Sequence, residues 1–280
     1  MRYAAGWLFL LSAVALPVCA SAADPNDFLA GDYIEPGTGE QLPYRLFEPI
    51  GYDATQSYPL VIFLHGSGES GTNNTSQVGS NIDNLYEHVK TPQYSSFLLA
   101  PQTNSGWASY DASPSDAERM VVSVIDQLET QYHIDSTRLY LTGLSMGGYG
   151  TWDMTWHYPG MFAAAVPISG GCDTSEAPLL VNQPIWCFHD ADDGTVPVQS
   201  DRDMIAALQA LGGNPHYTEY PNGGHNAWSR AYSEPELYDW MFSQHTVPEP
   251  ASLGLAISGI LAIGCYLAWG RRKQRQAAGR

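Results

Sequence analysis

Basic residues are scarce in this sequence of 280 residues, which has 12 lysines and arginines against 29 aspartates and glutamates. Six of the 12 lie at the ends of the chain, namely Arg2 and five residues within 271–280. The segment 3–270 therefore carries six basic residues against 29 acidic ones, a formal charge of −23. Such a surface repels phosphate backbones and anionic lipid headgroups, so we expect no nucleic-acid partner and no electrostatic docking to a membrane.

Cysteines are also few. Cys19 and Cys265 lie in the two terminal apolar segments, and only Cys172 and Cys187 belong to the central part. These two can pair in an oxidising compartment, although the stretch "PIWCFH" is typical of a core strand that holds a free cysteine. No histidine–cysteine cluster has zinc-like spacing, and no glycine motif of the phosphate-binding kind is present. We therefore expect neither a metal nor an organic cofactor.

The first 22 residues have the layout of a secretory signal peptide. Arg2 precedes an apolar run from Ala4 to Val18, and the small residues Ala20-Ser21-Ala22 predict cleavage near Ala22 or Ala23. The residues before Cys19 match a lipoprotein signal poorly, because the position preceding that cysteine is not small. A buried N-terminal helix is the other interpretation.

Residues 23–246 read as one α/β domain. Continuous apolar runs such as "YPLVIFLHG" (58–66) and "SSFLLAPQ" (95–102) are typical of strands buried on both faces, and further strands are expected in "RLYLTGLS", "FAAAVPISG", "PIWCFHD" and "HYTEY". Helical patterns alternate with them. One is opened by Ser113-Pro114, one ends before Pro159, and others cover 202–211 and "SEPELYDWMFSQH". This alternation predicts a mostly parallel sheet with helices on both faces.

The stretch "GLSMGG" (143–148) lies where a predicted strand meets a predicted helix. A G-x-S-x-G turn at such a corner exposes its serine, and the following backbone N–H groups and the helix N-terminus can stabilise an oxyanion. Ser145 is therefore the candidate nucleophile and Met146 an oxyanion donor. The second donor is expected from "HGSGE", at Ser67 or alternatively at Gly68, with His65 as a structural support of that loop.

A serine nucleophile needs a base and an acid that orients the base, and in this fold both follow it in the chain, the acid first. His225 lies in the loop "PNGGHNAW" after the last strand, and His189 and His216 are the remaining alternatives. The loop "HDADDGTVP" offers three acids. Asp193 is favoured because Gly194 follows it, with Asp190 and Asp192 as solubilising surface acids.

The aromatic residues give only weak indications of the substrate. Trp107 and Trp228 either present aromatic surface to a sugar or phenolic ester, or are ordinary packing residues. Trp152 and Trp156 are expected in the core, and His157 is expected to be a solvated imidazole on a helix.

Together, "LHGSGE", "LLAPQ", "LYLTGLSMGGYGTWDMTWHYPGMFAAAVPISGG", "HDADDGTVPV" and "GGHNAW" resemble the α/β-hydrolase superfamily over about 44–245. Within it, they resemble the secreted esterase branch that includes dienelactone-hydrolase-like, phospholipase/carboxylesterase-like and feruloyl-esterase-like proteins. The resemblance implies a nucleophile at Ser145, an acid at Asp193 and a base at His225. The extra acids beside Asp193 depart from the family pattern.

The implied reaction is hydrolysis of a small or polymeric carboxylic ester, such as a carbohydrate or phenolic ester, through an acyl-enzyme. A serine peptidase of the prolyl-oligopeptidase type shares this catalytic domain, but the chain has no room for that family's propeller domain. A non-catalytic surface or matrix protein that kept a hydrolase scaffold is the alternative outside enzymes.

The end of the chain, 247–280, combines three features. Pro248-Glu249-Pro250 precedes an uncharged apolar segment over 251–270, which is long enough to span a membrane, and 271–280 is basic. This order resembles the PEP-CTERM sorting signal, which exosortases recognise and process in bacteria that make exopolysaccharide. We expect an exported protein, anchored transiently and released at the cell surface or matrix. A permanent anchor and a chance proline-rich linker are the alternatives.

Overall fold

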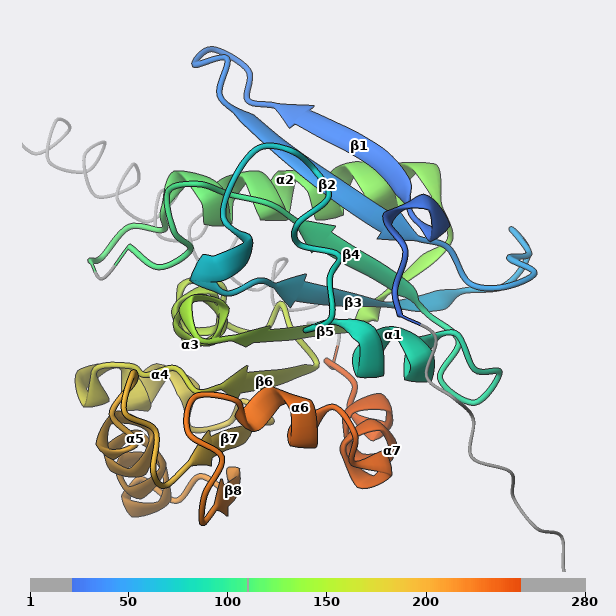
Figure 1. The fold of residues 1–280 in the computed structure, drawn as a ribbon. Coiled ribbons are helices and arrows are strands. Elements are labelled where there is room, and N and C mark those ends of the chain that lie inside the picture. The colour runs from blue at the N-terminus through green and yellow to red at the C-terminus, as the bar shows by residue number, and fades with distance from the viewer. Residues whose placement is uncertain (1–21, 110, 248–280) are drawn as a thin grey trace, which may run out of the picture.

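The computed structural model describes residues 22–109 and 111–247, whose strands form one sheet (Figure 1). The strands follow the spatial order β1-β2-β4-β3-β5-β6-β7-β8. Strands β3 to β8 are mutually parallel, whereas β1 and β2 are antiparallel and form one edge. The strand bounds are β1 Leu29–Ile34, β2 Gln41–Phe47, β3 Tyr58–Leu64, β4 Phe97–Pro101, β5 Ile134–Leu144, β6 Ala164–Ile168, β7 Trp186–Asp190 and β8 His216–Tyr220. The predicted α/β fold with a mostly parallel sheet is confirmed.

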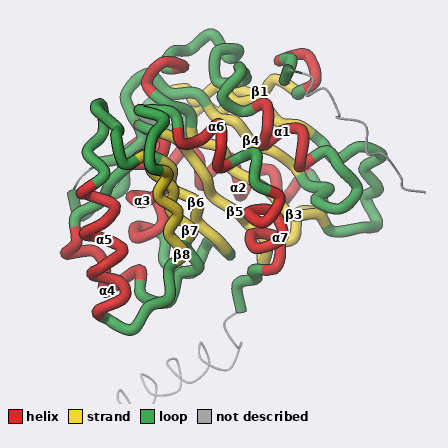
Figure 2. The backbone as a smooth tube through the Cα atoms, turned by 60° about the horizontal axis from the view of Figure 1, so that its bottom comes forward, coloured by secondary structure: helices red, strands yellow, loops and turns green. Residues whose placement is uncertain are grey.

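Helices cover both faces of this sheet (Figures 1 and 2). Their bounds are α1 Asp83–Val89, α2 Asp116–Gln131, α3 Met146–His157, α4 Ala177–Leu180, α5 Gln199–Ala210, α6 Ala227–Ala231 and α7 Pro235–Ser243. Side chains alternate along a strand, so β3 serves two cores. Val61 and Phe63 pack with α1, α6 and α7, whereas Leu60 and Ile62 pack with α2. This double burial explains why β3 reads as an unbroken apolar run.

The start of α2 differs from the expectation. Ser113-Pro114 precedes the helix, and the cap is Ser115, whose hydroxyl accepts the N–H of Glu118. The Glu118 carboxylate in turn accepts the N–H of Ser115, which completes a capping box. The reciprocal pair satisfies two backbone N–H groups at this N-terminus, and it draws the Glu118 side chain back against the helix end.

The two expected sorting segments fall almost wholly outside the described residues. Only residue 22 of the signal peptide and residue 247 of the tail are described, so the motif 248–250, the apolar segment 251–270 and the basic end 271–280 lie beyond them. Within 22–109 and 111–247, no helix is both long and apolar enough to cross a membrane. Cys172 and Cys187 are both free thiols, and Cys187 is buried in β7.

Candidate active site

Ser145 occupies a strained corner between β5 and α3. Its backbone has φ 53° and ψ −116°, a conformation that a residue with a Cβ rarely adopts. The corner is tight because α3 starts against the end of β3, and a Cβ on Gly147 would lie 1.9 Å from the carbonyl oxygen of Leu64. The expected strand–turn–helix corner is therefore present, with its serine at the turn.

His225 and Asp193 lie in line with this serine. The Nε2 atom of His225 is 2.8 Å from Ser145 Oγ, and its Nδ1 atom is 2.7 Å from Asp193 Oδ2. These three residues come from the ends of β5, β7 and β8, which a parallel sheet brings to one edge. The structure thus brings together the three residues that the sequence predicted to act together.

The carboxylate of Asp193 is fully buried but well supplied with donors. Its second oxygen accepts the backbone N–H groups of Thr195, at 2.8 Å, and Val196, at 2.9 Å. Burial raises the pKa of this carboxyl, but the hydrogen bonds from His225 and from the two backbone groups outweigh burial and bring the pKa below its ordinary value. Asp193 is therefore ionised and able to hold His225 in the tautomer that leaves Nε2 free to take a proton.

The expectation of solubilising surface acids is wrong for Asp190, which is buried, whereas Asp192 is exposed as expected. Asp190 is buried and forms an ion pair with Arg230, and Asp192 accepts the N–H of Gly224 at 2.8 Å. Both partners flank His225 in the chain. The acid-rich loop after β7 therefore fastens the loop that carries the imidazole, in addition to supplying Asp193.

His189 and His216, the two alternative bases, lie elsewhere. His216 begins β8 on the exposed surface. His189 is fully buried beneath Asp193, with Nδ1 2.7 Å from Asp201 Oδ2 and Nε2 3.1 Å from the carbonyl oxygen of Val196. Both ring nitrogens face acceptors, an arrangement that favours the protonated ring. Although burial lowers the pKa of His189, Asp201 and the other acceptors raise it overall.

The two expected oxyanion donors both begin helical elements. Met146 is the first residue of α3, and Ser67 is the first residue of a short 3-10 turn, Ser67–Glu69, so their N–H groups have no acceptor within these elements. The two segments touch, since Ser70 Oγ lies 4.0 Å from Met146 Sδ. Gly68, the alternative donor, is the middle residue of the same turn.

His65 supports this loop, as predicted. Its Nδ1 donates to the carbonyl oxygen of Gly66 at 2.7 Å, and its Nε2 accepts the N–H of Thr103 at 3.1 Å. Burial lowers the pKa of His65 to about 4, so the ring is neutral and keeps both hydrogen bonds near pH 7.

The expectation that Trp107 presents aromatic surface to a substrate is wrong. This residue is fully buried, packs edge-on against His65 and donates its indole N–H to the His65 carbonyl oxygen at 3.0 Å. Trp228 does lie beside the candidate base. Its ring contacts His225 edge-on at 5.1 Å between centroids, and its indole N–H donates to Asn81 Oδ1 at 3.0 Å. Trp228 therefore packs behind the imidazole.

Asn81 extends this contact to the oxyanion loop. Its amide nitrogen donates to Glu69 Oε1 at 2.7 Å, while its oxygen accepts from Trp228. A single amide thus joins the turn that contains Ser67 to the tryptophan that packs on His225. Sequence reasoning missed this connection, because Asn81 lies in a glycine- and asparagine-rich loop without a distinguishing pattern.

A cavity of about 350 Å³ opens along α3. Tyr149, one turn after Ser145, and Trp156, near the end of α3, contribute aromatic rings to its wall. Asp111, Asp153, Asp173 and Glu176 contribute carboxylates. Aromatic faces combined with carboxylates are suited to polyhydroxylated or phenolic groups.

Comparison with known proteins identifies the family. A model described as phospholipase/carboxylesterase matches residues 50–234. The chain belongs to this phospholipase/carboxylesterase family. Membership places it among carboxylic ester hydrolases, and it agrees with the α/β-hydrolase fold.

The chain is similar to known proteins, including two relatives in sequence and one solved structure. It is 28% identical to a probable feruloyl esterase C of Aspergillus niger, over 67% of this chain and 68% of that protein. It is 29% identical to the poly(3-hydroxyalkanoate) depolymerase C of Paucimonas lemoignei, over 47% of this chain and 33% of that protein. The crystal structure of a thermostable esterase superposes with a TM-score of 0.74 at 40% identity, over 79% of this chain and 64% of that one. The chain thus spans about a third of the depolymerase and less than two thirds of the thermostable esterase.

Proposed function

We propose that this protein is a serine esterase in which Ser145 is the nucleophile, His225 the base and Asp193 the acid. The observation that carries the proposal is the continuous hydrogen-bonded relay, 2.8 Å from Ser145 Oγ to His225 and 2.7 Å from His225 to Asp193. Each separation lies within the range for proton transfer between positioned groups.

The reaction follows from this arrangement. Ser145 Oγ attacks the ester carbonyl carbon while His225 Nε2 takes the hydroxyl proton, and the N–H groups of Met146 and Ser67 stabilise the oxyanion. The intermediate collapses as His225 gives its proton to the leaving alcohol, and an acyl-Ser145 ester remains. Water, activated by the same imidazole, then releases the acid and regenerates Ser145.

A phenolic or carbohydrate ester is the substrate class that we propose. The similarity to feruloyl esterase C supports it. The cavity along α3 includes Tyr149, one turn after Ser145, in its wall, but none of Ser145, Asp193 and His225 lines it. A hydroxyalkanoate polyester is the second candidate, because the chain is also similar to a polyhydroxyalkanoate depolymerase. Methyl ferulate, p-nitrophenyl acetate and an emulsion of poly(3-hydroxybutyrate) separate these classes in one set of assays.

A fluorophosphonate probe tests the nucleophile directly. We expect the wild-type protein to be labelled and to hydrolyse the esters, and the Ser145→Ala variant to do neither. Ser169→Ala is the matched control, because Ser169 also has a positive φ at a strand end but is buried without a hydrogen-bond partner for its hydroxyl in the part of the chain that the structure describes. Cleavage of peptide amides without ester turnover would instead favour a peptidase. An unlabelled, inert wild-type protein would favour a non-catalytic scaffold.

We also propose that the protein is exported and that its tail is processed by an exosortase-type enzyme. The order of a signal peptide at 1–22, an acidic central part and the tail at 247–280 supports this route. Mass spectrometry of the mature protein from its native host tests it. Peptides that begin near Ala22 or Ala23 and end before Leu253 are expected, whereas retained peptides from 253–280 would indicate a permanent anchor.

A further inference from the structure

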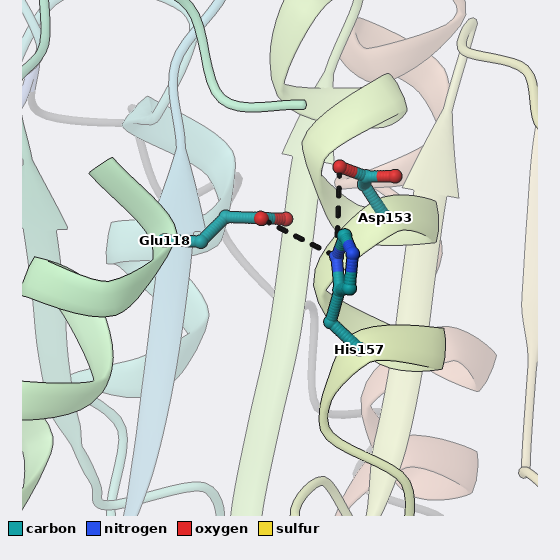
Figure 3. Close-up of side chains that lie close together, drawn as sticks. All are labelled: Glu118, Asp153 and His157. Carbon is teal, nitrogen blue, oxygen red and sulfur yellow. Dashed lines mark ion pairs between the residues drawn. The ribbon is translucent and has the colours of Figure 1, made fainter. Parts of the chain in front are cut away.

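Three side chains that the proposed reaction does not use meet at the other end of α3 (Figure 3). Glu118 comes from the first turn of α2, and Asp153 and His157 lie one turn apart on α3. His157 Nδ1 is 3.4 Å from Glu118 Oε2 and 3.7 Å from Asp153 Oδ2. The three side chains are at most 8% exposed, so the expectation of a solvated His157 is wrong.

Two atoms of this cluster have no hydrogen-bond partner within 22–109 and 111–247, namely Glu118 Oε1 and His157 Nδ1. The other polar atoms are engaged. Glu118 Oε2 accepts the N–H of Ser115, and Asp153 accepts the N–H and hydroxyl of Ser109 and the indole N–H of Trp156. A buried polar atom without a partner is unfavourable, so both orphaned atoms indicate that a component of the site is missing.

The tautomer of His157 follows from its other contact. Its Nε2 lies 3.1 Å from the carbonyl oxygen of Asp111, which can only accept, so Nε2 carries a hydrogen. In the neutral ring, Nδ1 then presents its lone pair to two carboxylate groups. This outer contact is the one that metal-binding histidines usually make, since a carbonyl acceptor orients the ring toward the ion.

No lysine or arginine forms an ion pair with Glu118 or Asp153 among the described residues. Arg119, the neighbour of Glu118 in the chain, pairs with Asp116 on the exposed face of α2. Separations of 3.4 and 3.7 Å are too long for good hydrogen bonds, but they match the roughly 3.4 Å between ligands of a tetrahedral ion with bonds of about 2.1 Å.

We propose that Glu118, Asp153 and His157 bind a divalent cation of the zinc class. The ligand atoms of the three residues lie within 4.8 Å of one another, and one nitrogen with two carboxylate oxygens is a donor set that suits Zn²⁺. Asp153 also lines the cavity along α3, which offers the ion an entry path and a water for its fourth position. The ion cross-links the start of α2 to the end of α3 and takes no part in ester chemistry.

Titration of metal-free protein with Zn²⁺ tests the site. After treatment with a chelator, calorimetry is expected to show a single saturable site per chain, and Zn²⁺ is expected to raise the melting temperature. His157→Gln should weaken the affinity at least about 100-fold, the upper end of what loss of an outer-shell partner costs a zinc site. His133→Gln, at a histidine outside the cluster, is the matched control and should bind like the wild type.

Glu118→Gln is the second variant, because its amide oxygen can keep the capping hydrogen bond to Ser115 and so preserve the fold. It too should lose Zn²⁺ binding and the thermal shift. Unchanged affinity in either variant would overturn the proposal, as would a wild type that binds no Zn²⁺. Inhibition of ester hydrolysis by Zn²⁺ without a rise in melting temperature would place the ion on His225 instead. Calorimetry and melting do not depend on turnover. The Zn²⁺ site can therefore be refuted without refuting the proposed esterase activity, and the esterase activity can be refuted without refuting the Zn²⁺ site.

Discussion

Asp193 and Glu118 are both fully buried carboxylates beside a histidine, near opposite ends of α3, yet their environments differ. Asp193 accepts two backbone N–H groups and the imidazole of His225, and its pKa is lowered. Glu118 accepts only the N–H of Ser115, and burial together with the nearby Asp153 raises its pKa to about 9. Burial alone therefore does not set the charge of a carboxyl group. The number of hydrogen-bond donors that face the carboxylate also shifts its pKa.

The largest expected effect comes from removing the charge of Asp193. Asp193→Asn should reduce kcat for ester hydrolysis by about 10⁴-fold, because the amide no longer selects the tautomer in which Nε2 accepts the proton of Ser145. Far-UV circular dichroism should show a retained fold. The matched change Glu118→Gln should leave kcat within about threefold, as expected of a change remote from the reacting atoms. Similar losses in the two variants would contradict the distinction drawn between the two carboxylates.

His189 also affects Asp193, because its buried ring has Nε2 3.4 Å from Asp193 Oδ2, the same oxygen that His225 contacts. His189→Gln leaves Asp201 as an unpaired buried charge and should cost about 3–5 kcal/mol of stability. We also expect kcat to fall about tenfold, through a displaced Asp193, which corresponds to about 1.4 kcal/mol of transition-state energy.

Denaturant unfolding and ester assays check both effects of His189→Gln. The control is His216→Gln, at an exposed position, with an expected change within about 0.5 kcal/mol. A loss of stability with normal kcat would show that His189 is purely structural.

Much of the fold and of the site could be predicted from the sequence, because their signals are local. Unbroken apolar runs marked the strands that are buried on both faces, and the turn around Ser145 marked the candidate nucleophile. Strands β1 and β2 were not predicted. They lie at the antiparallel edge, where β1 is mostly exposed and carries Gly31 and Asp32 in place of an apolar run.

What could not be predicted depends on partners that are distant in the sequence. The spacing of Asp153 and His157 on one helix face was visible, but Glu118 joins them only through the packing of α2 beside α3. The support that Asp190 gives the His225 loop likewise requires Arg230, and the burial of Trp107 requires the His65 loop. Such tertiary contacts leave no periodic pattern in either segment.

The pH dependence of stability should separate the two carboxyl groups in chelator-treated protein. The folded-state pKa of Glu118 lies above its ordinary value, so its contribution is present below about pH 4.5 and is lost as the pH rises toward 9. The contribution of Asp193 to stability depends on pH in the opposite direction, because it is lost as the pH falls through the lowered pKa of this residue.

Glu118→Gln should therefore melt higher than the wild type at pH 9, by about 2–4 °C for each 1 kcal/mol that the buried charge costs a domain of this size. At pH 5 the two should be nearly equal, because protonated Glu118 is already neutral. Melting curves at several pH values check this expectation. A parallel decline of both proteins between pH 5 and 9 would show that Glu118 is not the group responsible.

The smallest expected effect concerns the support behind the imidazole. Trp228→Phe keeps an aromatic ring beside His225 but removes the hydrogen bond to Asn81, and with it the link to Glu69 in the oxyanion loop. A neutral hydrogen bond contributes about 0.5–1.5 kcal/mol, so kcat should fall by about 2- to 10-fold. If the link acts by orienting the site, KM should change less than kcat. A rise in KM with unchanged kcat would instead show that Trp228 contacts the substrate, one of the two roles that the sequence left open.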